Sequence, residues 1–534
     1  MNGVATYNMK YVWVISLVAA LGGLLFGYDW VVIGGAKPFY ESLFGISESP
    51  YLQGWAMSSA LVGCLVGAVV SGALSDKFGR KRLLMLSGLM FTLSAVGTGL
   101  AWSFAWFNVF RWLGGVGIGL ASNLSPMYIA EVAPAQIRGR LVSINQLTIV
   151  IGILAAQITN WQIAEAVPTA DQVRLLLSPP SAISSAAGED GFDVDKERAA
   201  GLAIADQSGL AAVKQAFPKI GFLRPVTDDE KKAKAEEDAR IMTAYVLPTW
   251  NGQYGWRWMF SAGTLPAAMF FLLMFFVPES PRWLVKNAQD EPARGILARI
   301  GGSSYADSAI ADIRQTVVNE IERVNFRDLL EPKITRILML GVVLAVFQQW
   351  CGINVIFNYA QDVFRAAGYG VSEMLLQIVI TGTVNLILTF VAIYTVDRWG
   401  RRVLMLAGAS SLAVVYTLMA ACFFLQSTGP HVVLLVLLAI GCYACTLAPI
   451  TWVVLSEIFP NRIRGAAMSV SVFALWIGCL TLTFSFPQLQ RGLGPAGTFW
   501  LYSGICVLGF LFILRRLPET KGKTLEQIER ELVD

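Results

Sequence analysis

The sequence contains twelve long apolar stretches, separated by segments that hold most of the charged residues. A helix needs about 20 apolar residues to cross the hydrocarbon core of a bilayer. The stretches lie near residues 11–36, 53–74, 83–103, 104–130, 139–161, 256–277, 336–360, 374–396, 403–425, 432–456, 465–486 and 496–514. Of the 534 residues 55% are hydrophobic and 15% charged, against about 25% charged in soluble domains. The pattern predicts an all-α, polytopic membrane protein with twelve transmembrane helices.

The positions of the basic residues indicate how these helices are oriented. The connections expected on one side carry most of the basic residues: Lys77, Arg80, Lys81, Arg82, Arg138, Arg140, Arg398, Arg401, Arg402, Arg462, Arg464, Arg515 and Arg516. The short loops on the other side carry almost only Lys37 and Arg491. The positive-inside rule therefore predicts that both termini are cytoplasmic. The formal net charge is only +4, so we expect no nucleic-acid partner.

Cysteine and histidine usage argues against a metal centre or a disulfide framework. All seven cysteines fall in apolar stretches, and His431 is the single histidine. We expect the cysteines to pack as small hydrophobic residues, with no metal and no cofactor. Glycines four residues apart, as in Gly63/Gly67 and Gly115/Gly119, allow close approach of two helices. We read Gly115, Gly117 and Gly119 in this way, because a dinucleotide-binding loop must follow a soluble strand.

Two motifs recur in the same order in the two parts of the chain. Asp76-x-x-Gly79-Arg80 returns as Asp397-x-x-Gly400-Arg401, 321 residues later. Glu131-x-x-Pro134-x-x-x-Arg138-Gly139 returns as Glu457-x-x-Pro460-x-x-x-Arg464-Gly465, 326 residues later. The nearly constant offset predicts two homologous six-helix halves, as in transporters built from parallel repeats.

A third repeated element locates an insertion. Pro278-Glu279-Ser280 and Pro518-Glu519-Thr520 follow the preceding motif's proline by 144 and 58 residues, so the first half holds about 86 additional residues. We expect 162–255 to be an extracytoplasmic surface elaboration; a lid over the outer vestibule is the alternative. The remaining boundaries place the N-terminal half at 1–161 and 256–277, cytoplasmic linker helices at 278–335, the C-terminal half at 336–517 and a cytoplasmic tail at 518–534.

The motifs resemble the sugar porter family of the major facilitator superfamily, and within it the proton-coupled xylose symporters of bacteria. Six segments carry the resemblance, and they cover nearly everything outside the insertion: Gly22 to Asp29 (GGLLFGYD), Asp76 to Arg80, Arg111 to Arg138 with PMYIAEVAP, Pro278 to Leu284 (PESPRWL), Gln348 to Asn354 (QQWCGIN) and Pro518 to Gly522 (PETKG). The resemblance implies a transporter rather than an enzyme.

Neutral amides suit the binding of a sugar, because they replace the hydrogen bonds that its hydroxyls make with water. Gln348 and Gln349 lie about 18 Å into the seventh predicted span, near the midplane where such transporters bind substrate. The resemblance implies sugar binding by Gln146, Gln348, Gln349, Asn354 and Asn385, with Trp452 against the apolar face of the ring. The alternative for the Gln348/Gln349 pair is hydrogen bonding between helices.

Three positions depart from the pattern of the xylose symporters. Leu475 replaces a polar amide, Asn358 stands where a tyrosine is usual, and Ala448-Pro449 replaces Gly-Pro. Since each borders the sugar site in the family, the sequence does not identify the sugar.

Asp29 and Arg111 are, by the predicted spans, the only ionisable residues well inside the membrane. Such residues are costly and are functional candidates. Both lie about seven residues from the outer end of their spans, so they can pair at one depth. The resemblance implies that they couple protons to sugar; a purely structural ion pair is the alternative.

The acidic and basic residues of the repeated motifs form the predicted cytoplasmic gate: Asp76, Arg80, Glu131, Arg138, Asp397, Arg401, Glu457 and Arg464. The resemblance implies a salt-bridge latch that closes the inner side in the outward-open state. We therefore expect a proton-coupled monosaccharide importer that works by alternating access as a monomer in a bacterial inner membrane. A facilitative uniporter and a transporter-like sugar sensor are the alternatives.

Overall fold

The computed structural model describes residues 7–134, 137–178, 193–217, 228–320, 331–427, 429–459 and 464–519. Within these residues the regular elements are helices. The N-terminal half consists of α1 (Met9–Phe44), α2 (Pro50–Phe78), α3 (Arg80–Gly99), α4 (Phe104–Val132), α5 (Arg138–Ile163) and a sixth segment built from η1 (Asn251–Gly255), α11 (Trp256–Ser261) and α12 (Thr264–Leu273).

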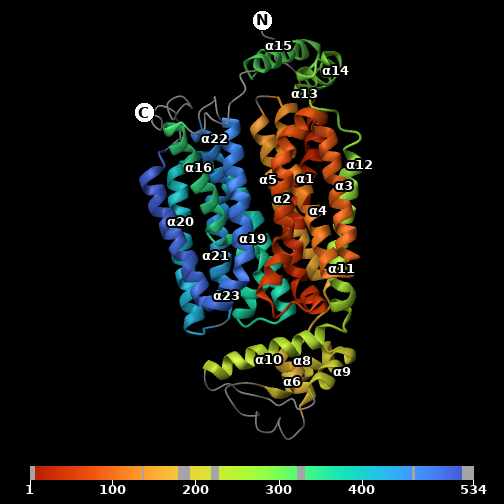
Figure 1. Ribbon diagram of the computed structural model, residues 1–534, viewed down its shortest axis with the longest axis vertical. Coiled ribbons are helices and arrows are strands. Elements are labelled where there is room, and N and C mark those ends of the chain that lie inside the picture. The colour runs from red at the N-terminus through yellow and green to blue at the C-terminus, as the bar shows by residue number, and fades with distance from the viewer. Residues whose placement is uncertain are drawn as a thin grey trace.

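The C-terminal half packs beside it and contains the other six segments (Figure 1). They are α16 (Pro332–Trp350) with α17 (Ile353–Asn358), α19 (Val371–Trp399), α20 (Arg401–Phe424), α21 (Pro430–Cys445) with α22 (Leu447–Ile458), and two segments within α23 (Arg464–Arg516). Gly494 has φ 68° and ψ 174°, which divides α23 into the eleventh and twelfth segments. The short helix α18 (Ala360–Ala366) follows α17.

Hydropathy alone identifies most of these segments. Among the described residues, nine helical stretches are long and apolar enough to cross a membrane, and α23 is one of them. Its division at Gly494 adds a tenth. The fourth segment, α4, and the sixth, which is interrupted between α11 and α12, complete the predicted set of twelve.

Two predicted spans contain a helix break that the sequence did not reveal: the seventh between α16 and α17, and the tenth between α21 and α22. Gly352 follows α16 with φ 88°, a left-handed conformation that glycine adopts without strain. Thr446 separates α21 from α22 with φ −129° and ψ −88°. Membrane-buried backbone outside a helix is tolerated where protein or a cavity surrounds it, and transporters place their sites at such breaks.

The first helix also differs from the prediction, because it continues past residue 36 to Phe44. This extension places Lys37 and Glu41 inside the helix, and both are buried. Two buried ionisable side chains therefore lie in α1 beyond the end of the predicted first span.

Within and between the halves, helices pack closely. In the N-terminal half α2 packs on α4 and α1 on α5, and the halves meet through α2 with α23 and α5 with α19. The predicted role of the spaced glycines is confirmed: a side chain at Gly115 would overlap the Ala60 carbonyl, and one at Gly63 the Trp112 carbonyl.

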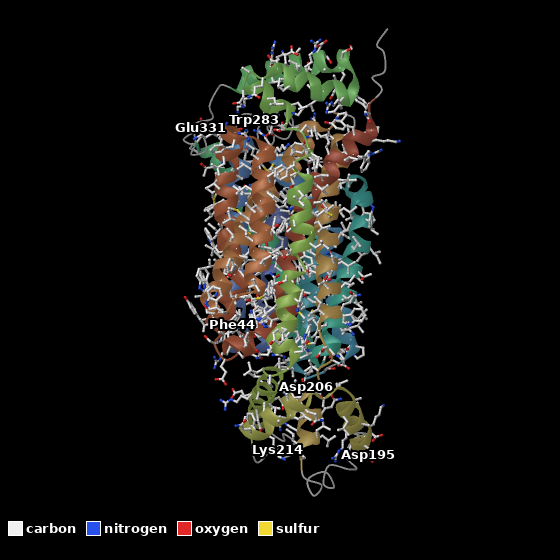
Figure 2. All side chains as sticks on the ribbon, turned by 90° about the vertical axis from the view of Figure 1, so that its right-hand side faces the viewer. Phe44, Asp195, Asp206, Lys214, Trp283 and Glu331 are labelled. Carbon is white, nitrogen blue, oxygen red and sulfur yellow. The ribbon has the colours of Figure 1, made fainter. Side chains whose placement is uncertain are left out.

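The polar segments lie at opposite ends of the bundle (Figures 1 and 2). At the insertion end lie α6 (Ala170–Leu177), α8 (Val194–Ile204), α9 (Gln207–Ala216) and α10 (Asp228–Val246). At the linker end lie α13 (Pro281–Lys286), α14 (Asp290–Gly301) and α15 (Ser303–Glu320). Figure 2 shows Trp283 at the linker end and Asp206 at the insertion end.

The insertion helices enclose a small interior of their own. Arg174 of α6 is 1% exposed and pairs with Glu237 at 3.0 Å and Asp238 at 2.9 Å, both on α10. Burial raises the pKa of Asp238, and the Arg174 guanidinium opposes that rise. The Tyr245 hydroxyl accepts a hydrogen bond from the Asp206 amide at 2.6 Å. The insertion is thus a packed helical unit.

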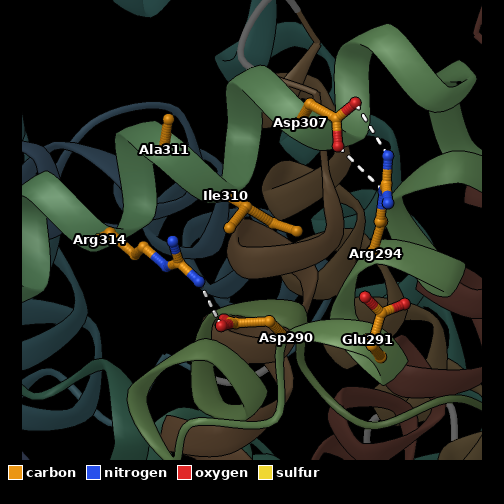
Figure 3. Close-up of a pocket in the computed structure, with 7 residues that line it drawn as sticks. All are labelled: Asp290, Glu291, Arg294, Asp307, Ile310, Ala311 and Arg314. Carbon is orange, nitrogen blue, oxygen red and sulfur yellow. Dashed lines mark hydrogen bonds and ion pairs between the residues drawn. The ribbon is translucent and has the colours of Figure 1, made fainter.

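The linker helices α14 and α15 form an open surface pocket of about 340 Å³ between them (Figure 3). Arg294 Nε lies 2.9 Å from Asp307 Oδ1, and Arg314 pairs with Asp290 on the other side of the pocket. Ile310 is buried and faces the pocket. Because these ion pairs are largely exposed, they contribute little to stability, and we assign the pocket no role in transport.

Candidate substrate and coupling site

Three amide side chains meet at the break in the seventh helix. Gln348 and Gln349 occupy the last turn of α16, and Asn354 lies in α17 just beyond Gly352. Gln349 Nε2 donates to Gln348 Oε1 at 3.0 Å, and Asn354 Nδ2 donates to Gln349 Oε1. Both glutamines are buried. We call these three residues the amide cluster; it provides neutral donors and acceptors in the interior of the bundle.

An aromatic group from both halves lies close to the amide cluster. Trp476 of α23 contacts Trp30 and Phe26 of α1, with ring centroids 6.0 Å apart in each case. Cys479 lies one helical turn from Trp476 and accepts a weak hydrogen bond from Asn354 Nδ2 at 3.8 Å. Trp476 contacts the aromatic residues and Cys479 contacts Asn354, so the aromatic residues and the amide cluster lie side by side. Sequence reasoning missed this aromatic trio (Phe26, Trp30, Trp476), although Phe26 lies within GGLLFGYD.

The remaining predicted sugar residues lie on other helices. Asn385 of α19 is buried, Gln146 of α5 is exposed, and Trp452 of α22 is 40% exposed. In the part of the chain that the structure describes, no hydrogen bond joins these three side chains to the amide cluster. The structure therefore brings together Gln348, Gln349 and Asn354, and leaves the other three without a contact that defines their role.

The predicted ion pair of the N-terminal half is present. Arg111 Nη1 lies 2.8 Å from Asp29 Oδ1 and also donates to the Asp29 carbonyl at 3.3 Å. Arg111 is 2% exposed and lies over the Phe260 ring, 5.6 Å from its centroid. Asp29 Oδ2 is buried and hydrogen-bonds to no described residue. Because Trp30 follows Asp29 directly, the ion pair lies next to the aromatic trio.

At the linker end, the repeated motif of the N-terminal half forms a compact ionic cluster. Arg80 contacts Glu131 at 3.0 Å and Asp76 at 3.3 Å. Glu279 Oε1 accepts hydrogen bonds from the amides of Arg80, at 2.9 Å, and Lys81, at 3.1 Å. Glu279 thus caps the beginning of α3, where a carboxylate is favoured by the helix dipole.

The C-terminal half repeats this arrangement. Arg401 contacts Glu457 at 3.1 Å, and Glu519 accepts hydrogen bonds from the amides of Arg401 and Arg402 at 2.9 and 3.1 Å. The glycines before the two capped helices also correspond: Gly79 has φ 91° and ψ 165°, and Gly400 has φ 89° and ψ 151°. The sequence indicated the repeated Pro-Glu pair but not the capping role of its glutamate.

The structure shows less about the contacts of the other predicted gate residues. Arg138 is exposed at the beginning of α5. The side chains of Asp397 and Arg464 lie outside the described residues, as does the tail from 520 to 534. The pairs Arg80–Glu131 and Arg401–Glu457 each join residues of the same half.

A comparison with known families identifies the architecture. Residues 15–186 and 240–532 match the sequence model of the sugar (and other) transporter family. The chain belongs to this family. Residues 187–239 fall outside the match, so most of the predicted insertion is additional to the family's common sequence.

Relatives and solved structures agree with this assignment. The chain is 34% identical to the D-xylose-proton symporter of Escherichia coli K12, covering 98% of this chain and 96% of the relative. It is 32% identical to the arabinose-proton symporter of Bacillus subtilis, with the same two coverages. The inward-open structure of the xylose transporter XylE from E. coli superimposes with a TM-score of 0.74 at 32% identity, covering 98% of this chain and 100% of that chain.

These likenesses confirm the predicted fold class. The chain is a multi-pass membrane protein of the major facilitator fold, with twelve transmembrane helices in two six-helix halves. Its family consists of transporters, in agreement with the prediction that the chain is not an enzyme.

Proposed function

We propose that this chain is a proton-coupled symporter that imports a monosaccharide by alternating access. The observation that carries the proposal is the arrangement at the centre of the bundle: an amide cluster with two buried glutamines at a helix break, and nearby, on the opposite half, the ion pair between the partly buried Asp29 and the buried Arg111. The names of the relatives, a D-xylose-proton and an arabinose-proton symporter, support the same chemistry.

The amide cluster binds the sugar in this proposal. Amides can donate to and accept from neighbouring hydroxyls, so they replace the water lost on entry into the bundle. The aromatic trio offers apolar surface to the C–H face of the ring, and we extend the site to Gln146, Asn385 and Trp452 from the remaining helices. In the absence of sugar the amides form hydrogen bonds with each other, which lowers the free-energy cost of burying them.

Asp29 binds the transported proton. In the observed conformation its charge is compensated by Arg111 at 2.8 Å. A conformation that separates the two removes this compensation, and a buried carboxylate without a cation favours its protonated form. Proton binding and sugar binding are thereby linked to the same conformational change.

We assign the linker end to the cytoplasm and the insertion end to the outside of a bacterial inner membrane, with both termini cytoplasmic. The concentration of basic residues in the linker-end connections supports this orientation. The superposition on an inward-open structure supports an inward-open state. In that state the linker-end ion pairs stay within each half, and we propose that the eight predicted gate residues form a latch between the halves when the inner side closes.

The domain assignment follows from this orientation. The insertion at 162–255 is an extracytoplasmic elaboration, and the helices of 278–335 form a cytoplasmic connection between the halves. We propose that a single copy is sufficient for transport, because one chain supplies both the amide cluster and the ion pair.

The test is counterflow and uptake in proteoliposomes. Preloaded vesicles are challenged with a panel of unlabelled pentoses and hexoses, and the sugar that supports exchange identifies the substrate. Addition of that sugar should then alkalinise the external medium. Sugar exchange without a proton signal would identify a facilitative uniporter, and failure of every sugar in the panel would overturn the proposed substrate class.

A further inference from the structure

Three ionisable side chains that have no place in the mechanism above meet at the insertion end. Lys37 and Glu41 belong to the last two turns of α1, and Asp362 belongs to α18. Lys37 Nζ lies 2.6 Å from Asp362 Oδ2 and 3.7 Å from Glu41 Oε1. The side chains of Lys37, Glu41 and Asp362 are only 5%, 8% and 12% exposed. We call these residues the outer triad.

The outer triad joins the two halves. Lys37 and Glu41 lie in the N-terminal half, whereas Asp362 follows the broken seventh helix of the C-terminal half. The Gln361 side chain donates to the Gly35 carbonyl at 2.9 Å, so a second hydrogen bond beside the triad also joins the halves. Lys37 Nζ lies 5.5 Å from the centroid of the Tyr359 ring, which covers it on one side.

An exposed ion pair near the insertion end lies in a different setting. Arg240 pairs with Glu48 at 3.2 Å, but the two side chains are 62% and 76% exposed. An exposed pair of this kind is worth little, because water and salt screen it. A buried pair is different: loss of one partner leaves the other charge without water or a counter-ion. The closed state at this end therefore depends on the ion pair between Lys37 and Asp362.

α1 and α18 belong to different halves and contact each other near the insertion end, so opening of that end separates them. Separation exposes all three charged groups to water, and their hydration then replaces the lost ion pair. The closed state is then stabilised by the Lys37–Asp362 contact, and the open state by hydration. The balance depends on both partners, and neither touches the amide cluster or Asp29 through a described contact.

We propose that Lys37, Glu41 and Asp362 form an ionic lock on the outer gate that sets the equilibrium between the outward-closed and outward-open states. Lys37 and Asp362 form the bond between the halves, and Glu41 holds Lys37 on its own helix in the position that meets Asp362. The proposal rests on the alternating-access mechanism, but it is independent of the sugar and of the proton site.

Distance measurements by pulsed electron paramagnetic resonance test the lock without sugar. Nitroxide labels at Leu100→Cys and Leu425→Cys report on the two halves, because both leucines are exposed, at 67% and 73%, beside the insertion ends of α3 and α20. The three half-buried cysteines (Cys422, Cys442 and Cys445) are replaced by alanine to prevent labelling. Lys37→Met, which leaves two buried carboxylates facing each other, should raise the ratio of open to closed molecules by about tenfold or more.

Two further variants separate a lock from a merely structural contact. Asp362→Asn keeps Lys37 beside Glu41 and should give a smaller shift toward the open state in a protein that remains folded. The exchanged pair Lys37→Asp with Asp362→Lys should restore the closed distance. Arg240→Gln removes the exposed pair at the same end and should leave the distances unchanged.

An unchanged distance distribution in Asp362→Asn would overturn the proposal, as would an exchanged pair that stays as open as Lys37→Met. A lower thermal stability with no change in distances would show that the triad is structural only. Because the experiment uses neither sugar nor a proton gradient, failure of the lock is distinguishable from failure of the proposed transport function.

Discussion

The two halves are alike at the linker end and different at the centre of the bundle. At the linker end, Arg80 with Glu131 and Arg401 with Glu457 form equivalent pairs at 3.0 and 3.1 Å. Glu279 and Glu519 cap α3 and α20 through hydrogen bonds of 2.9 Å to the first helical amide. At the centre, the N-terminal half carries an ion pair, whereas the C-terminal half carries neutral amides.

This difference indicates where duplication has been retained and where the halves have specialised. The motifs that we propose to close the inner side are present in both halves. Proton binding requires a titratable group and sugar binding requires neutral hydrogen-bonding groups. In the proposed mechanism, the proton-binding carboxylate of Asp29 and the amide cluster belong to different halves, so the carboxylate stays outside the hydrogen bonds of the amide cluster.

The largest expected effect comes from removing the carboxylate of Asp29, the group that distinguishes the N-terminal half. Asp29→Asn should abolish uphill uptake and sugar-induced alkalinisation, because the proposed proton carrier is lost, while sugar binding remains. One proton per neutral sugar is worth about 2.3 kcal/mol at 100 mV, or roughly fiftyfold accumulation. Uptake into energised vesicles measures this quantity, with Asp307→Asn on the exposed linker as the control. Accumulation by Asp29→Asn above the external concentration would contradict proton coupling through this residue.

The second effect tests the specialisation of the C-terminal half. Gln348→Ala should weaken sugar binding by about 1–3 kcal/mol, because it leaves buried hydrogen-bonding groups without a partner. Isothermal calorimetry on the purified protein measures this change. Gln253→Ala, whose exposed side chain donates to the Leu247 carbonyl outside the site, should bind sugar normally. An unaltered affinity in Gln348→Ala would mean that the amide cluster is not the binding site.

A smaller effect tests whether the helix caps of the two halves are equivalent. Glu279→Gln and Glu519→Gln each remove the charge that caps a helix, and each should cost about 1 kcal/mol of unfolding free energy. Thermal unfolding in detergent should show a decrease of about one degree for each variant. Since each glutamate accepts hydrogen bonds from the first two amides of its helix, the two decreases should be similar. A large decrease in one half alone would show that the ionic clusters are not equivalent.

The smallest effect concerns the part of the N-terminal half that has no counterpart. Replacement of residues 170–246 by a short Gly/Ser linker removes the insertion helices but retains the Val167 amide, which donates to Ser372 at 2.9 Å. Because the C-terminal half completes the same architecture without an insertion, uptake should stay within about twofold of the native rate. Loss of uptake at normal membrane abundance would instead support a lid role for the insertion.

The sequence by itself determined the architecture, because the signal for a membrane-spanning helix is local. Every backbone polar group in lipid must be satisfied within its own segment, so each helix is visible in the apolar stretch that forms it. The repeated Asp-x-x-Gly-Arg and Glu-x-x-Pro motifs then indicated two halves and the position of the insertion. The same local logic marked Asp29, Arg111, Gln348 and Gln349, since ionisable and amide groups inside apolar stretches are conspicuous.

Only the tertiary structure decided which of these groups meet. Lys37 and Asp362 are 325 residues apart, and Trp30 contacts Trp476 through helices of opposite halves. Such contacts depend on the depth and rotation of each helix, which are set by packing against its neighbours and not by hydropathy. The breaks at Gly352 and Thr446 were also invisible in the apolar stretches, because a glycine or threonine inside a span is compatible with a continuous helix. Whether the backbone leaves helical geometry at Gly352 or Thr446 depends on the side chains that surround that position.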